Sequence, residues 1–312
     1  MKNVQDIYSL SPMQQGLLFH ALSDSANGAY VERLSWLLHG KLDVEAYRAA
    51  WEQVIKRHPI LSTSFHYQDL DEPVQVVRKT FKLPWQHEDW RDLSAAEQEQ
   101  RFNELLKDER RRGFKLNSAP LMRLTLLQLQ PNLHRFLWSY HHLLLDGWSV
   151  SLVLRDVLEA YERLRRAQPL PSGGVRPYRD YIGWLQKQDV KAAEAFWREK
   201  LRGFSVPTKL GIERSTVSSN GTPGERYRKL HRVLSVETTT ALQSLARQQQ
   251  LTLSPMIHAA WSLLLSRYSG EREVLFGSVV SGRPTALAGA ETMVGLFINT
   301  LPVRVAVSGD VS

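Results

Sequence analysis

Stretches of helical and strand-like periodicity alternate along the whole chain. A helix is predicted where apolar residues recur every three or four positions, and a strand where apolar and polar residues alternate. The clearest start is Ser11-Pro12 followed by Gln14, a capping-box spacing ahead of Leu17-Leu18-Phe19. The helices are predicted from residue 12, over 44–57, 94–112, from 149 or 151 onward, and over 178–201, 238–250 and 254–268, and the strands over 121–130, 134–140, 228–234, 274–280 and 301–307.

Because strands and helices alternate in both halves, we expect an α/β (α+β) protein with two lobes. Gln168–Pro177 is rich in proline and glycine and resembles a connector. The predicted organisation is therefore a first lobe over residues 1–170, a connector over 171–177, and a second lobe over 178–312.

The junction of one strand with the next helix carries the candidate chemistry. Phe136, Trp138 and Tyr140 alternate with Leu137 and Ser139, which is the period of a half-buried strand, and the chain then enters His141-His142-Leu-Leu-Leu-Asp146-Gly147. Histidine titrates near neutral pH and can accept a proton from an attacking group. Neighbouring strand residues point to opposite faces, so this pair would make poor joint metal ligands. The residues alone leave catalysis and two structural histidines equally open.

Composition removes several classes of function. The chain has no cysteine, which excludes a disulfide, a thiolate nucleophile and a cysteine-bound metal. It has neither an apolar run of bilayer length nor the apolar core of a signal peptide at its N-terminus, so a cytoplasmic location is the simplest interpretation. The net charge of +8 would suit nucleic acid. However, the arginines at 110–112 and at 163, 165 and 166 stand at predicted helix ends, where they complement the helix dipole, and an acidic protein partner would suit them equally.

The heptad His141–Gly147 resembles the HHxxxDG signature of condensation domains from nonribosomal peptide synthetases, whose fold resembles chloramphenicol acetyltransferase. Four other segments resemble further motifs of that family, and all five occur in the family's order. These segments are Leu10–Phe19, Arg57–Phe65, Tyr178–Trp184 and Val294–Arg304. Together they span nearly the whole chain, which makes a chance match untenable.

The resemblance implies a site in a tunnel between two lobes, with a phosphopantetheine arm entering from each end. It assigns the central role to His142, as a base for the acceptor amine or as a group that orients it. Gly147 would let the acceptor arm pass and offer its amide to the oxyanion. His141 would support the turn from the opposite side of the strand.

The same resemblance gives Asp146 a structural part as the partner of an arginine. Arg57 is the first choice for that arginine, and Arg283 is the alternative. Ser149, Trp197 and Asn299 are candidates for the tunnel wall; ordinary core or turn positions would explain Trp197 and Asn299 as well. No metal ligand is expected.

Two departures from the family pattern stand out. Ser62 occupies a position where the second motif usually carries arginine, so a polar contact is missing or replaced. The family also continues with further strands and helices after the fifth motif. We therefore expect an incomplete second lobe, with apolar surface left exposed near Leu301–Val307.

By resemblance, the expected reaction is amide-bond formation between a donor acyl or peptidyl thioester and an acceptor aminoacyl thioester. Both would be carried by peptidyl carrier domains, with an adenylation domain adjacent. The phosphopantetheine arms would belong to the carriers, with no cofactor bound directly and neither nucleic acid nor membrane as partner. His141 and His142 exclude the heterocyclising relatives, and the opening motif and Leu145 resemble domains that take an L-configured donor. The alternatives are a non-catalytic carrier-docking module, a sibling activity such as epimerisation or ester formation, and an acyltransferase that uses free coenzyme A.

Overall fold

The computed structural model describes residues 3–23, 30–170, 173–210 and 230–307. The chain forms two compact units. The first comprises Met1–Gln188 and Ser281–Asn299, and the second comprises Asp189–Val280 and Thr300–Ser312. These units do not coincide with the predicted lobes, because the first extends to residue 188 and the chain comes back to it after residue 280. We call Ser281–Asn299 the returning segment.

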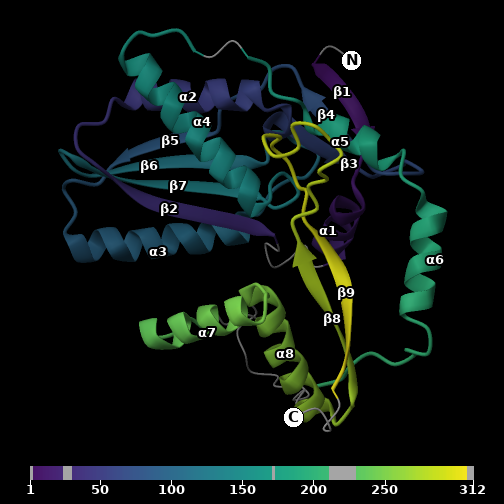
Figure 1. Ribbon diagram of the computed structural model, residues 1–312. Coiled ribbons are helices and arrows are strands. Elements are labelled where there is room, and N and C mark those ends of the chain that lie inside the picture. Colours follow the sequence, from purple (N-terminus) through teal and green to yellow (C-terminus); the bar gives the residue numbers. More distant parts are fainter. Residues whose placement is uncertain (1–2, 24–29, 171–172, 211–229, 308–312) are drawn as a thin grey trace, which may run out of the picture. The chain divides into compact units, whose positions relative to one another are not determined.

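A four-stranded sheet forms the centre of the first unit (Figure 1), in the order β2 (Val31–His39), β7 (Leu133–His141), β6 (Met122–Gln130) and β5 (Trp85–Asp89). Strand β7 is antiparallel to both β2 and β6, and β5 runs parallel to β6. The helices α2 (Val44–Arg57) and α4 (Gly147–Arg165) cover one face, and α3 (Ala95–Arg112) covers the other. The predicted strands at 121–130 and 134–140 are confirmed.

The aromatic alternation of β7 explains this layering. Phe136 stacks on Trp51 of α2, with 5.5 Å between ring centroids, and Trp138 meets the same indole edge-on at 5.0 Å. The intervening Leu137 packs instead with Phe102 of α3. Strand β7 is therefore buried on both faces, whereas its sequence period suggested burial on one face only. The reason is α3, which supplies a second apolar layer.

A second, three-stranded antiparallel sheet lies in the same unit, in the order β1 (Val4–Ser9), β4 (Val74–Arg78) and β3 (Thr63–His66). Between β1 and β2 runs α1 (Pro12–Ser23), which begins as predicted. The Ser11 Oγ accepts from the Gln14 amide at 3.2 Å, and the Gln14 Oε1 accepts from the Ser11 amide at 3.0 Å, so the capping box is complete. A short 3-10 helix, η2 (Pro59–Ser62), follows α2, and α5 (Tyr178–Leu185) completes the unit.

The departure noted in the second motif is accommodated locally. The Ser62 side chain is buried, and its hydroxyl donates to the Pro59 carbonyl at 3.0 Å and to the Arg78 carbonyl at 3.2 Å. Both acceptors are backbone groups, so the small side chain ties η2 to β4 without a charged partner.

The second unit contains α6 (Val190–Lys200), α7 (Val236–Gln248), α8 (Leu253–Ser269) and a two-stranded sheet of β8 (Glu273–Val280) and β9 (Asn299–Ala306). The single helix predicted over 178–201 is wrong, because Asp189 caps a separate helix by accepting from the Ala192 amide at 2.9 Å. The strand predicted over 228–234 is not formed at 230–234, and residues 228–229 lie outside the described part of the chain.

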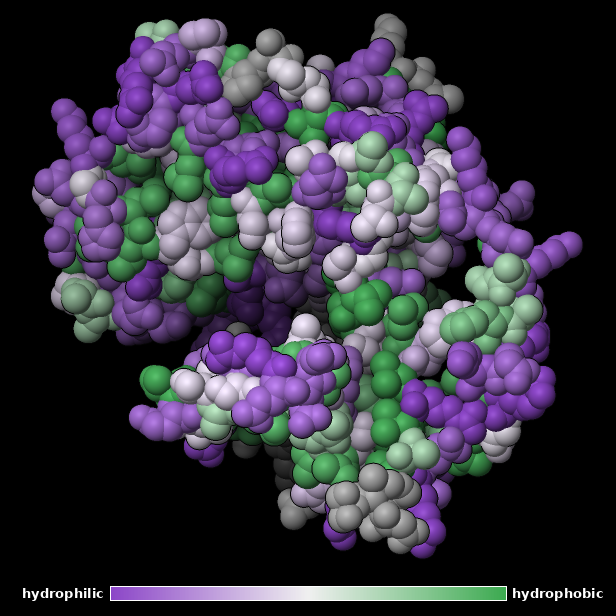
Figure 2. Space-filling view, in the orientation of Figure 1, coloured by the Kyte–Doolittle hydropathy of each residue, from purple (hydrophilic) through white to green (hydrophobic). Residues whose placement is uncertain are grey.

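Large apolar side chains are exposed on the second unit. One face of α8 carries Ile257, Trp261, Leu264 and Tyr268, which are 45–65% exposed. Figure 2 shows further hydrophobic residues at the surface over α6 and over β8 and β9. The apolar surface expected near the fifth motif is present. Among the described residues, no helix has the length and apolar character required to cross a membrane.

The arginines that end α3 and α4 pair with acidic residues about one turn earlier. Arg111 contacts Asp108, and Arg163 lies 3.1 Å from Glu159. Both pairs are exposed, so their effect on stability is small. Their position agrees with the interpretation of these arginines as helix-end charges.

A buried carboxylate ties α2 to α4. The Asp156 Oδ2 lies 2.9 Å from the Nε2 of His58 and 3.3 Å from the Nε of Arg57, and the Oδ1 lies 3.0 Å from Arg155. Burial by itself raises the pKa of Asp156, but the hydrogen bonds from His58 and Arg155 outweigh it, so this pKa lies below the ordinary value.

We therefore expect Asp156→Asn to lower the free energy of unfolding by about 1–3 kcal/mol at pH 7. A depressed pKa stabilises the fold above the unfolded-state value of about 4, and this contribution is lost as the pH falls through the folded-state value. Urea unfolding of both proteins from pH 7 to pH 3 should show the difference shrinking toward acid. The exposed Asp71→Asn is the control, and a difference for Asp156→Asn that does not change with pH would contradict the assignment.

Candidate active site

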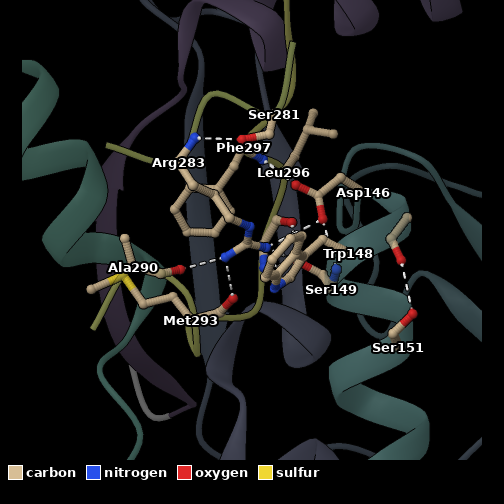
Figure 3. A network of polar contacts seen from close by, with 12 residues as sticks. Asp146, Trp148, Ser149, Ser151, Ser281, Arg283, Ala290, Met293, Leu296 and Phe297 are labelled. Carbon is tan, nitrogen blue, oxygen red and sulfur yellow. Dashed lines mark hydrogen bonds and ion pairs between the residues drawn. The ribbon is translucent and has the colours of Figure 1, made fainter. Parts of the chain in front are cut away.

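The turn between β7 and α4 carries the signature residues. Helix α4 begins at Gly147, because the Asp146 Oδ1 accepts from the Ser149 amide at 2.7 Å and caps the helix. The predicted start at residue 149 or 151 is therefore too late. A serine cap was expected from the sequence, but the aspartate of the signature provides it (Figure 3).

Asp146 has three partners, and His142 is not one of them. Besides capping α4, its Oδ1 lies 3.3 Å from the Nη2 of Arg283, and its Oδ2 accepts from the Phe297 amide at 2.9 Å. The Asp146 side chain is 1% exposed and that of Arg283 is 7% exposed. The predicted arginine partner is present, and it is the alternative, Arg283.

The first choice, Arg57, is wrong. Its Nε lies 3.3 Å from Asp156, ten positions beyond Asp146 on α4. Arg57 ends α2, and the packing of α2 on α4 places that end against the middle of α4. The end of α2 is therefore directed to a different carboxylate.

Arg283 and Ser149 bind the returning segment to the start of α4 (Figure 3). The Arg283 Nη1 donates to the carbonyls of Ala290 and Met293, and its Nη2 donates to the Ser149 Oγ at 2.8 Å. The Ser149 hydroxyl donates to the Gly295 carbonyl at 2.7 Å and accepts from the Gly295 amide at 3.0 Å. Ser149 is fully buried, so its prediction as a tunnel-wall residue does not agree with its position. Its hydroxyl is used to hold Gly295.

Tyr178 of the fourth motif packs against the same glycine. A Cβ atom added to Gly295 would stand 2.1 Å from the Tyr178 Cδ2, closer than any real contact. The phenol donates to the Leu296 carbonyl at 2.6 Å. The third, fourth and fifth motifs therefore meet at one point of the first unit. Sequence reasoning missed Gly295 and Tyr178 as site residues, although both lie within motifs that it identified.

His141 supports the turn from inside. Its side chain is buried between Tyr30 and Phe114, and its Nδ1 accepts from the Leu143 amide at 3.2 Å. Burial, with a smaller contribution from His142, lowers the pKa of His141 to about 4, so the ring is neutral at physiological pH. A neutral ring is also what that hydrogen bond requires, since only an unprotonated Nδ1 can accept.

His142 is only partly buried. Its amide donates to the Tyr30 carbonyl at 2.8 Å, which fixes its backbone against β2. Its Nδ1 is buried and has no hydrogen-bond partner among the described residues. The strand alternation thus sends two adjacent histidines to different environments.

Gly147 is exposed, and a Cβ atom there would meet nothing within 4 Å. Its φ angle is not positive, so neither backbone conformation nor neighbouring atoms of the described chain require glycine. The missing side chain leaves open space directly after the signature aspartate.

The remaining candidates do not join this cluster by any described contact. Asn299 is the exposed last residue of the returning segment and the first of β9, while Trp197 lies half-buried on α6 of the second unit. Their place in a tunnel stays a prediction. Within the described residues, no group of three or more His, Cys, Asp or Glu side chains is arranged to hold a metal ion.

Comparison with known proteins decides the family. The family model for the condensation domain matches residues 4–312. The chain belongs to the condensation domain family. A linear gramicidin synthase of Brevibacillus parabrevis is 45% identical over all of this chain, which spans 6% of that protein, and tyrocidine synthase 2 of the same organism is 37% identical over 97% of this chain, which spans 8% of it.

Solved condensation domains share the fold. A mutant of the starter condensation domain of rhizomide synthetase, in complex with C8-CoA, matches with a TM-score of 0.79 at 21% identity, over 97% of this chain and 67% of that one. The first condensation domain of the calcium-dependent antibiotic synthetase, in complex with a substrate analogue, matches with a TM-score of 0.75 at 19% identity, over 98% and 71%. The mixed α/β fold implied by the motifs is therefore confirmed.

The pairing of Asp146 can be tested by double-mutant cycles. We expect Asp146→Asn and Arg283→Met to be coupled by about 0.5–3 kcal/mol in the free energy of unfolding, because they share a buried ion pair. Asp146→Asn and Arg57→Met should be additive within about 0.5 kcal/mol, because they have no common partner. Chemical denaturation of the single and double variants measures both. Coupling of Asp146 to Arg57 instead would reverse the assignment.

The packing of Gly295 gives a second test. Gly295→Ala should lower the free energy of unfolding by about 1–3 kcal/mol, because its methyl group has no room beside Tyr178. Gly183→Ala on α5 is the matched control, since a Cβ there meets nothing within 4 Å and alanine favours a helix. Thermal melts followed by circular dichroism compare them. Equal melting temperatures for Gly295→Ala and the wild type would refute the interlock.

Proposed function

We propose that this condensation domain forms the amide bond between a donor acyl or peptidyl thioester and an acceptor aminoacyl thioester of a nonribosomal peptide synthetase. The observation that carries the proposal is the arrangement of the signature turn. Its second histidine retains an unpaired ring nitrogen beside a glycine that opens onto free space, while every other polar side chain of the turn is bonded within the fold.

In the proposed reaction, the acceptor amine attacks the donor thioester carbonyl, the new C–N bond forms, and the C–S bond breaks. The amine loses a proton, and the departing thiolate of the donor arm gains one. His142 is the group assigned to this proton and to the orientation of the amine. General-base help is worth about 10²–10⁴-fold, and positioning alone can reach the same size.

The geometry bears on which contribution dominates. Asp146 is directed to Arg283, Ser149 and Phe297, so it does not orient or neutralise His142 as the aspartate of a hydrolase triad would. A protonated His142 would have no carboxylate partner among its described contacts. This favours a role for His142 in holding the amine and the tetrahedral intermediate over complete proton abstraction.

Gly147 is assigned to the passage of the acceptor arm and to an amide contact with the oxyanion. Both arms are phosphopantetheine groups that belong to donor and acceptor carrier domains, so the domain needs no cofactor of its own. The relatives are large synthases of which this chain spans only a small part, which supports carrier domains and an adenylation domain as partners. The L-configured donor, proposed from the opening motif and Leu145, rests on sequence alone.

A non-catalytic docking module and a sibling acyl transfer of the same fold are the alternatives. A docking module would have no need for an unpaired ring nitrogen at His142 or for a residue without a side chain at Gly147. Both features therefore favour catalysis.

The decisive experiment uses the protein with a panel of aminoacyl-loaded carrier domains, and mass spectrometry detects the amide product. His142→Ala should lower the rate of amide formation by about 10²–10⁴-fold with an unchanged melting temperature, because it removes only the open-facing ring. His39→Ala, at an exposed position at the end of β2, is the control and should be fully active.

Two results would count against the proposal. Carrier binding without any amide product in the wild type would favour a docking module. A His142→Ala variant as active as the wild type would remove His142 from the reaction.

A further inference from the structure

Leu143, the residue directly after His142, is held at both of its peptide groups. Its amide donates to the Nδ1 of His141 at 3.2 Å, and its carbonyl accepts from the Nε2 of Gln14 at 3.1 Å. The amide of His142 itself is bonded to the Tyr30 carbonyl. Three successive peptide groups around His142 therefore each have a fixed partner, and the contact from Gln14 comes from 129 positions away in the chain.

Gln14 is unusually constrained for a helix residue. Its side chain is 0% exposed, and both ends of its carboxamide are used. The Oε1 accepts from the Ser11 amide at 3.0 Å and from the Nε2 of Gln75 at 3.0 Å, while the Nε2 reaches the Leu143 carbonyl. Capping of α1 needs only the oxygen. The nitrogen is the part of Gln14 that contacts the signature turn.

We propose that Gln14 is a positioning residue for the reaction, acting through the Leu143 carbonyl to fix the backbone that carries His142; this rests on the function proposed above. The peptide group of Leu143 is buried, so without Gln14 it would tilt to find another donor. A tilt there moves the His142 ring, and misplacement of a reacting group by about 1 Å costs about 100-fold in rate.

Three variants separate this role from the stability of α1. Gln14→Met keeps the length of the side chain and removes the contact with Leu143. Ser11→Ala removes the hydroxyl that caps α1 and leaves that contact in place. Gln75→Met removes the neighbouring amide and also leaves the contact in place.

We expect all three variants to lower the melting temperature by several degrees, since each removes buried hydrogen bonds. Only Gln14→Met should also lower kcat for amide formation, by about 10–100-fold, with KM within about twofold of the wild type. Each variant is assayed well below its own melting temperature with the fastest carrier pair of the panel. Equal losses of kcat in all three variants would show a purely structural role and overturn the proposal.

A second measurement does not depend on turnover. Side-chain resonances of histidines labelled with ¹³C and ¹⁵N report the environment of His142, which is identified by its absence in His142→Ala. We expect the His142 resonance to shift or broaden in Gln14→Met and to stay in place in Ser11→Ala and Gln75→Met. An unmoved His142 resonance in Gln14→Met would refute the positioning role, even if the wild type formed no amide and the proposed function had itself failed.

Discussion

The buried carboxylate of Asp146 imposes the constraint on which the site depends. Removing a charged carboxylate from water costs several kcal/mol unless the fold supplies charge and hydrogen bonds in return. The N-terminus of α4 supplies one donor, while the Phe297 amide and the Arg283 guanidinium come from the returning segment. The turn, the start of α4 and residues 281–299 can therefore exist only as one structure. Ser149 and Tyr178 add to the same junction by fixing Gly295 and Leu296.

Tandem histidines acquire different properties here because consecutive residues at the end of a strand point to opposite sides. His141 enters the core, where desolvation keeps it neutral and its ring nitrogen becomes an acceptor for the backbone. His142 keeps part of its ring accessible and has a nitrogen without a partner among the described residues. Two identical side chains thus become a structural acceptor and a candidate reactive group through their position alone.

What the sequence could predict followed from neighbours along the chain. The capping box of α1, the stripe of α2 and the alternation of β7 depend on residues a few positions apart, and all three were predicted. The strands β1 and β2 were missed, because charged residues such as Asp6 and Glu32 weaken their pattern, and pairing with β4 and β7 defines them. The partner of Asp146 was misassigned to Arg57 for a related reason. Arg283 lies 137 positions away, and no local pattern links the two.

The distance along the chain between Asp146 and Phe297 also determines when the signature turn can be finished. The two residues are 151 positions apart, so during synthesis the β2–β7–β6–β5 sheet and α4 emerge long before the groups that neutralise Asp146. Contacts between such distant residues form late and slow folding. A nascent chain that has not yet reached Arg283 has a folded sheet region and an uncompensated aspartate at the head of α4. The residues proposed for peptide synthesis are thus assembled last, when almost the whole chain has been made.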